Sequence, residues 1–148
     1  MYSVILAILL QLSGNPGQLA HVQRVVDGDT VKIEQAGEIV TVRLEHIDAP
    51  ERKQEGGQMA TWALAHMIEG KDVTIVGGKK DRYGRLIGTI YVGEINVNRA
   101  MVAQGQAWWY ARYSKDKSYQ QTEQAAREAH RGLWSGEAVE PWVWRKKK

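Results

Sequence analysis

Two closely spaced turn signals constrain the fold of this chain more than any other feature of its sequence. The segments Asp27–Asp29 and Ala36–Glu38 place Gly beside small or acidic residues, as tight turns do, between short runs of β-branched and apolar residues. Thr30–Ile33 is the run between the two turns, and Val40–Leu44 follows the second. The pattern predicts two consecutive hairpins and therefore an antiparallel meander.

The third predicted strand, Val40–Leu44, alternates apolar and polar side chains. One face should therefore be buried, and the face that bears Arg43 should lie outside the core. The alternation fails at Ile47, which is apolar but lies in the phase of Arg43. A bulge or sharp twist near Glu45–His46 would restore it, and bulges often redirect side chains beside active sites. We expect a site outside the barrel or sheet core, at the end of this strand.

Acidic residues lie at this strand end and at the first turn. Pro50 should end the strand at about Asp48, so Asp48 and Glu51 would project from the strand end. Asp29 and Asp48, with a backbone carbonyl near Ala49, would supply oxygen ligands to a hard ion. The chain contains no cysteine, which excludes thiolate metal sites and disulfides and favours calcium or magnesium. Glu51 is the candidate general base that deprotonates an attacking water.

Two arginines complete this pattern. Arg43 and Arg85 each carry a planar fork that matches the oxygens of a phosphodiester and would stabilise its developing charge. Taken singly, each fragment has an ordinary explanation as a turn, a surface ion pair, a solvated loop acid or a hairpin. Their conjunction predicts a metal-dependent phosphodiesterase that acts on nucleic acid.

Helical and extended patterns alternate in the rest of the chain. Apolar spacing predicts a helix between Gly56 and Gly70, a helix capped by Asn96 that runs through Gln104, and a last helix closed by Gly132. Further strands are predicted at 72–76, where Gly77–Gly78 would break the strand, at 86–91, and along the aromatic segment 108–113. These elements favour an α+β fold, for which a small oligonucleotide-binding (OB) barrel with helices is the natural candidate.

The N-terminal segment differs from the rest of the chain. Val4–Leu10 is an unbroken apolar run that is too short to span a bilayer but suits the core of a secretory signal. We expect residues 1–20 to be a cleaved leader and the protein to be secreted or periplasmic. The alternative is a leader with no export role on a cytoplasmic protein.

The C-terminal segment, 142–148, is a basic tail. Its last four residues carry four positive charges, whereas the whole chain has a formal net charge of +3. The rest of the chain therefore sums to about −1, and the tail accounts for the net positive charge. The tail could be a solvated segment or could contact backbone phosphate. Trp142 and Trp144 flank it and could pack on the barrel or touch nucleic acid.

The motifs above form part of a longer series, which consists of Val26–Val31, Val42–Leu44, Ile47–Glu51, Asp81–Arg85, Val97–Asn98, Gln104–Ala107 and Gly132–Trp134. In this series, over roughly His21 to Pro141, the chain resembles the staphylococcal nuclease (thermonuclease) family. The resemblance implies a domain at 21–141 with a five-stranded antiparallel OB barrel and three α-helices. It also implies calcium-dependent cleavage of DNA or RNA with low sequence specificity, calcium suiting the site better than magnesium.

Carried over residue by residue, the resemblance assigns most of the candidate site. Asp29 and Asp48 match the calcium ligands, together with the backbone carbonyl of Ala49, and Asp27 matches a nearby acid in the metal pocket. Glu51 matches the general base. The matches to the phosphate-binding arginines are Arg43 and Arg85, and those to residues near the bound nucleotide are Arg82, Tyr83 and Tyr113.

Three positions depart from the family pattern. Ala49 stands where a threonine would add a hydroxyl, although its backbone carbonyl is kept. Ala111 replaces one of two tyrosines that line the nucleotide pocket, and Arg82 replaces a lysine. The catalytic set is intact, so we expect activity, whereas the base-stacking side of the pocket is altered.

A second hypothesis is a non-catalytic nucleic-acid-binding module on the same barrel. Degenerate members of the family typically lose the arginine–carboxylate set, which this chain keeps. We expect a monomer whose partner is nucleic acid, with no stable membrane association once the leader is removed.

Overall fold

Five long strands form a closed barrel in the computed structural model, which describes residues 17–147. The barrel order is β3-β2-β1-β5-β6, and β3 pairs with β6 to close it. The strands are β1 (Gln18–Asp27), β2 (Thr30–Gln35), β3 (Glu38–Leu44), β5 (Asp72–Lys80) and β6 (Leu86–Val92). The predicted five-stranded α+β barrel is confirmed, and its closing pair, β3 with β6, is parallel whereas the other pairs are antiparallel.

The two predicted turns build the meander β1-β2-β3. In the first, the backbone N–H of Asp29 donates to Asp27 Oδ1 at 3.1 Å, which is a side-chain-stabilised turn. In the second, Ala36 and Gly37 both have positive φ, 51° and 80°, and they join the paired residues at the ends of β2 and β3. Such two-residue loops match the twist of antiparallel strands.

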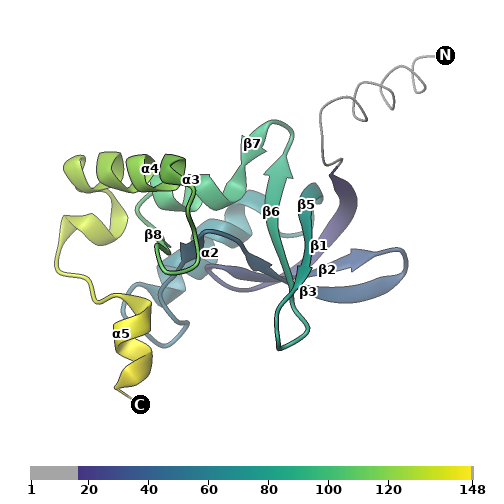
Figure 1. The fold of residues 1–148 in the computed structure, drawn as a ribbon, viewed down its shortest axis with the longest axis horizontal. Helices are drawn as coiled ribbons and strands as arrows, with labels where there is room; N and C mark the ends of the chain where they lie inside the picture. The colour runs from purple at the N-terminus through teal and green to yellow at the C-terminus, as the bar shows by residue number, and fades with distance from the viewer. Residues whose placement is uncertain (1–16, 148) are drawn as a thin grey trace.

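Three helices lie at one side of the barrel, where Figure 1 shows α3 and α4 next to each other. They are α2 (Gly57–Ile68), α3 (Val97–Ala103) and α4 (Lys117–Glu128). Helix α2 packs on β1, and α3 packs on β6 and α4. The short strands β4 (Ile47–Asp48) and β8 (Trp108–Trp109) pair with each other, and β7 (Ile95–Asn96) extends β6. The core includes buried Val42, Leu44, Ile47, Leu64, Ile90 and Met101.

The glycine pair at 77–78 does not end its strand, contrary to the prediction. Strand β5 continues to Lys80, with a register shift between Val76 and Lys79. Gly77 has φ 142°, and a Cβ there would lie 2.4 Å from the carbonyl oxygen of Ile87. The glycine therefore permits a close approach of β5 to β6 rather than breaking the strand.

Two C-terminal predictions were also wrong. Only Trp108–Trp109 of the aromatic segment is a strand, because the backbone turns at Tyr110, whose carbonyl accepts from the N–H of Tyr113 at 3.0 Å. Helix α4 ends at Glu128, since His130 leaves the helical region with φ 52°.

Gly132 instead begins a short 3-10 helix, η1 (Gly132–Ser135). A Cβ on Gly132 would lie 2.5 Å from the carbonyl oxygen of Gly105. Gly132 is thus required for contact between η1 and the end of α3, not for closing α4.

A helix that the sequence did not predict, α5 (Pro141–Lys146), occupies most of the basic tail. Proline suits the first position of a helix, because a backbone N–H at that position would have no partner within the helix and its absence costs nothing. At the other end, residues 1–16 of the expected leader lie outside the described residues, and 18–20 belong to β1. Within 17–147, no helix combines the length and apolar character needed to cross a membrane.

Candidate active site

The β3–β4 connection directs Asp48 away from the barrel core. Strand β3 ends at Leu44, and the chain turns at Glu45–His46, where His46 has φ 73°. The ring of His46 lies 2.7 Å from Ser114 Oγ through Nδ1, and this contact holds the turn. The sharp twist predicted at Glu45–His46 is confirmed, and it buries Ile47 while it sets Asp48 beside Arg43.

Arg43 links the two predicted metal ligands. Its Nη1 donates to the carbonyls of Leu44 and Ile47, at 2.6 and 2.9 Å. Its Nη2 lies 3.3 Å from Asp48 Oδ1 and 3.4 Å from Asp29 Oδ2. The Arg43 side chain is only 14% exposed, its backbone contacts fix the orientation of the guanidinium, and both acids share the charge of that group.

Hairpin register explains why Asp29 reaches this site. Thr30 is paired with Arg43, so the residue before β2 lies opposite the end of β3, and Leu44 N–H donates to the carbonyl of Asp29 at 2.8 Å. The Asp29 carboxylate accepts from the N–H of Ala49 at 2.8 Å and from Thr30 Oγ1 at 3.0 Å. A Cβ on Gly28 would lie 2.7 Å from the Ala49 Cβ, so glycine is needed for this contact.

The acids of this cluster oppose one another's ionisation. Burial, reinforced by the charges of Asp29 and Glu51, raises the pKa of Asp27 to about 7. Burial also raises the pKa of Asp48 to about 6, with Asp29 adding to the shift while arginine contacts reduce it. Burial therefore disfavours the ionised form of both acids, and a bound cation would favour it.

The donor set fits a hard cation that keeps several waters. Within residues 17–147, no group of three Asp, Glu or His side chains encloses a metal position. Asp29 and Asp48, joined through Arg43, instead offer two carboxylates, and every available ligand is oxygen. Calcium and magnesium accept such sets when backbone carbonyls and water complete the shell.

Glu51 lies in a tightly built loop after β4. Its carbonyl accepts from the N–H of Gln54 at 2.8 Å, and its own N–H donates to Gln54 Oε1 at 3.1 Å. A Cβ on Gly57 would lie 1.9 Å from the Glu51 carbonyl oxygen, so the first residue of α2 must be glycine. The loop thus fixes the backbone of Glu51 and leaves its side chain 33% exposed.

Arg85 and its neighbours lie in the β5–β6 hairpin. Barrel closure pairs Arg43 with Ile87, which brings the base of this hairpin beside β3. Arg85 Nε pairs with Asp81 Oδ2 at 2.7 Å rather than with the carboxylate cluster. Burial acts to raise the pKa of Asp81, but the hydrogen bonds from Arg85 and Tyr83 together outweigh it, so the pKa is lowered. The guanidinium groups of Arg82 and Arg85 lie 4.9 and 5.4 Å from the centre of the Tyr83 ring.

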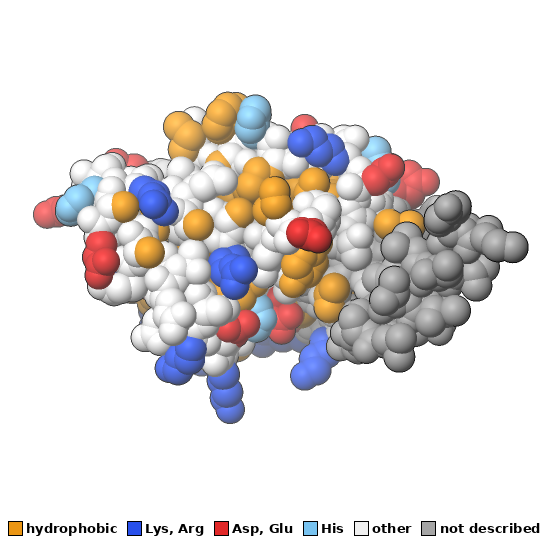
Figure 2. Space-filling model, turned by 90° about the horizontal axis from the view of Figure 1, so that it is seen from above, with side chains coloured by type: hydrophobic (Ala, Val, Ile, Leu, Met, Phe, Trp, Pro, Cys, Tyr) orange, Lys and Arg blue, Asp and Glu red, His pale blue; other side chains and the backbone are white. Residues whose placement is uncertain are grey.

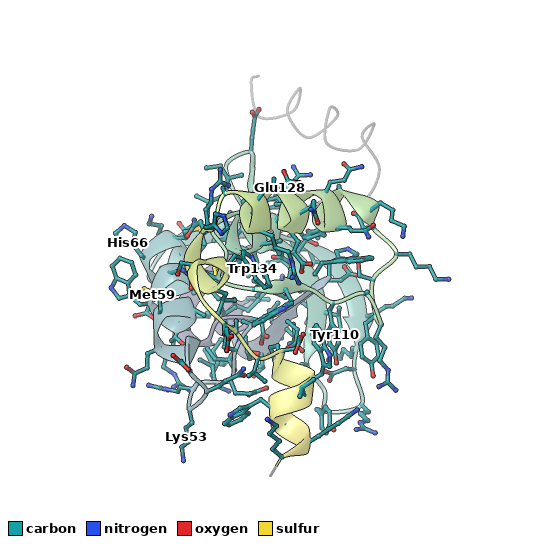
Figure 3. All side chains as sticks on the ribbon, turned by 90° about the vertical axis from the view of Figure 1, so that its left-hand side faces the viewer. Lys53, Met59, His66, Tyr110, Glu128 and Trp134 are labelled. Carbon is teal, nitrogen blue, oxygen red and sulfur yellow. The ribbon has the colours of Figure 1, made fainter. Side chains whose placement is uncertain are left out.

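Aromatic side chains border the cluster. Tyr113, one of the predicted nucleotide contacts, is 67% exposed and meets Tyr110 edge to face. Tyr110 stacks on Trp142 with the rings 5.5 Å apart and 8° from parallel, and Figure 3 shows Tyr110 beside the start of α5. A shallow cavity of about 230 Å³ lies here, lined by Tyr110, Ala111, Arg112, Trp142 and Lys146.

Sequence reasoning missed Arg145. Its Nη2 donates to Asp48 Oδ2 at 2.8 Å, and its Nη1 donates to Glu51 Oε1 at 2.7 Å and to Asp48 Oδ1 at 3.2 Å. The hydrogen bond to Asp48 raises the pKa of Arg145, which is fully charged in any case. The signal that could have found it is the proline followed by two tryptophans, which indicates a helix that docks rather than a solvated tail.

Acidic and basic side chains are interspersed over the face in Figure 2, without one dominant basic patch.

Comparison with known proteins gives matches over most of the chain. The model of the staphylococcal nuclease homologue family matches residues 41–136. An uncharacterized endonuclease of Escherichia coli O157:H7 is 42% identical over 129 residues, which cover 86% of this chain and 84% of that protein. A micrococcal nuclease of Shigella flexneri is 38% identical over 137 residues, with 84% and 79% covered. The staphylococcal-like nuclease CAN1 of Arabidopsis thaliana is 40% identical over 108 residues, with 72% and 33% covered.

Proposed function

The chain belongs to the staphylococcal nuclease homologue family, and on that premise we propose that it is a nuclease that hydrolyses phosphodiester bonds in DNA or RNA with a bound divalent cation. The observation that carries the proposal is the cluster in which Arg43 bridges Asp29 and Asp48 beside the carboxylate of Glu51. A cation, a guanidinium and a base are the groups that hydrolysis of a phosphodiester requires.

Asp29, Asp48 and a backbone carbonyl near Ala49 would hold the cation. Calcium is proposed ahead of magnesium, because a site with two carboxylates and irregular backbone suits its flexible shell better than the strict octahedron of magnesium. The bound ion would supply positive charge that offsets the repulsion between the phosphodiester and an attacking hydroxide.

The side chains of this chain would divide the remaining work. Glu51 would take a proton from a water molecule while the oxygen of that water bonds to phosphorus. The P–O bond to the leaving sugar oxygen would break, and the sugar oxygen would gain a proton from solvent. Arg43 would donate to a phosphate oxygen from a guanidinium already fixed by the backbone. Arg85 would exchange Asp81 for a second contact to the phosphate.

The aromatic side of the site would hold the nucleotide. Tyr113 is exposed beside Tyr110 and could stack on a base, with Arg82 and Tyr83 at the neighbouring hairpin. A monomer that is secreted or periplasmic completes the proposal. Sequencing the N-terminus of the native protein would test export, and light scattering would test the monomer.

Cleavage assays on the full chain test the function directly. Single-stranded DNA, double-stranded DNA and RNA would be offered with calcium, with magnesium and with a chelator. We expect calcium-dependent cleavage, which Glu51→Gln should lower by roughly a hundredfold or more, the scale of a lost general base. Glu55→Gln is the matched control, because it makes the same change at an exposed residue of the same loop.

Two outcomes would contradict the proposal. Cleavage by Glu51→Gln at the rate of the unmodified protein would remove Glu51 from the mechanism. Binding of nucleic acid without cleavage in either metal would instead assign a non-catalytic binding module.

A further inference from the structure

The guanidinium of Arg145 occupies the carboxylates that the proposed function reserves for the cation and the base. Both oxygens of Asp48 accept from Arg145, and Oδ1 also accepts from Arg43. The same guanidinium holds Oε1 of Glu51 at 2.7 Å. In this arrangement Asp48 has both oxygens engaged by arginine, and Glu51 is paired rather than available to a water.

Specific contacts place Arg145 there. Pro141 is buried, and Trp142 stacks on Tyr110 and meets Trp108 edge to face. Just before α5, the carbonyl of Val139 accepts from Gln54 Nε2 at 2.6 Å, which ties the segment to the loop that carries Glu51. The C-terminal segment is therefore docked on the site.

Helix α5 is also short and largely exposed, so it can detach from the site. Helix α5 has only six residues, and isolated helices of that length are unstable in water. Of these six residues only Pro141 is buried, and the Arg145 side chain is 37% exposed. The ion pairs of Arg145 are thus one part of the contacts that hold α5, and the helix can be released when the carboxylates of that cluster find a better partner.

A divalent cation is such a partner. Guanidinium and metal ion need the same carboxylate lone pairs, and two cations cannot share them at contact distance without strong repulsion. We propose that Arg145 is an internal counter-cation of the proposed metal site, which fills it in the metal-free protein and is displaced when a divalent cation binds. Helix α5 is then a latch whose release is coupled to metal loading, and the inference rests on the metal site of the proposed function.

Metal binding measured without any substrate tests the latch. Isothermal titration calorimetry with calcium would compare the full chain with Arg145→Gln. Removal of the competitor should tighten calcium binding by at least about fivefold, the lower end of usual coupling between linked sites. Lys146→Gln is the matched control, because it removes one positive charge from the adjacent position. It should change the affinity less than twofold, and Arg145→Lys should fall between the two.

Hydrogen exchange gives an independent readout. Saturating calcium should speed amide exchange of residues 141–147 several-fold in the unmodified protein, because α5 is released. In Arg145→Gln, the exchange of these amides should be fast both with and without calcium.

Equal calcium affinity in the unmodified protein and Arg145→Gln would overturn the inference, as would unchanged protection of α5 on calcium addition. Absence of calcium binding to either protein would overturn it too, since nothing would then displace the arginine. None of these readouts uses cleavage, so a protein that binds calcium and releases α5 without cutting nucleic acid would retain the latch and lose the proposed function.

Discussion

Arg43 is the residue on which the two buried acids of the site depend. Its neighbours Asp29 and Asp48 are almost fully buried, and each lies within 3.4 Å of its Nη2. Removing one partner of such a buried pair leaves an uncompensated charge, which costs far more than a surface ion pair is worth. The stability of the free protein and the geometry of the site therefore rest on the same guanidinium.

Replacement of Arg43 should therefore destabilise the fold as well as impair the site. Arg43→Ala is expected to lower the free energy of unfolding by about 3 kcal/mol in chelator, the lower end for a broken buried pair, because Arg145 still neutralises Asp48. Urea unfolding would measure this. Arg82→Ala, at an exposed arginine in a hairpin, is the control and should change stability by less than about 0.5 kcal/mol. A loss of similar size in both variants would contradict a structural role for Arg43.

The residues around Arg43 could be predicted because they are local. Asp29 and Asp48 adjoin one hairpin, so the alternation and the turn signals fix their relative positions within a few residues. Arg145 could not be predicted in this way, since its partners Glu51 and Asp48 lie 94 and 97 residues away in sequence. Its position depends on where the whole C-terminal segment docks, which no local pattern specifies.

At the scale of elements, the sequence predicted which helices form better than where they end. Helix α3 begins after Asn96 as expected, and the Asn96 side chain accepts from the N–H of Arg99. Two of the errors occurred at glycines, which sequence reasoning interprets as breaks. Gly77 and Gly132 instead allow a backbone to approach another backbone closely, and only the partner segments, β6 and the end of α3, reveal that role.

The start of α4 provides a prediction with a defined pH dependence. Asp116 caps the helix by accepting from the N–H and hydroxyl of Ser118, and these two hydrogen bonds lower its pKa. A carboxyl with a lowered folded-state pKa contributes stability above its unfolded value, and this stability is lost as the pH falls through the folded value. The contribution should therefore be complete at neutral pH and should decrease below about pH 4.

Asp116→Ala should lower the free energy of unfolding by about 1 kcal/mol at neutral pH, and by less near pH 3. Urea unfolding at both pH values would measure the difference. Asp116→Asn retains a cap that does not titrate, so its stability relative to Asp116→Ala should stay constant with pH. A cost of Asp116→Ala that is the same at both pH values would show that the carboxylate charge has no part in the cap.

At the scale of the whole molecule, the barrel brings the acids and a basic hairpin to the same strand end. The register of β2 with β3 brings together the chain turns that carry Asp27, Asp29 and Asp48, and the parallel pairing of β3 with β6 places the base of the hairpin that carries Arg85 beside β3. Burial raises the pKa of Asp27 and of Asp48, and the charge of Asp29 adds to both shifts, so the fold holds these carboxylates where their charged form is disfavoured. Under the proposed function, such a fold would give up stability without the cation and recover it when the cation binds.

This exchange predicts a substitution whose effect on stability is neutral or favourable without calcium and unfavourable with calcium. Asp29→Asn keeps the shape of the side chain: its oxygen can accept from Ala49 N–H and its amide can donate to Thr30 Oγ1, in place of the contacts now made. It removes one buried negative charge. Because Arg43 keeps Asp48 as a partner, no buried charge is left uncompensated, and in chelator the variant should be as stable as the unmodified protein or more stable by up to about 1 kcal/mol.

With calcium at about a hundred times its dissociation constant, the order should reverse. The unmodified protein should then gain about 2.7 kcal/mol from binding to the folded state alone. The variant, which lacks one proposed ligand, should gain far less.

Asp116→Asn makes the same chemical change outside the cluster and should respond to calcium as the unmodified protein does. Thermal unfolding of all three proteins, with calcium and with chelator, measures both halves of the prediction. If Asp29→Asn were less stable than the unmodified protein in chelator, the carboxylate would be serving the fold rather than a cation. An undiminished response of the variant to calcium would place the cation elsewhere in the molecule.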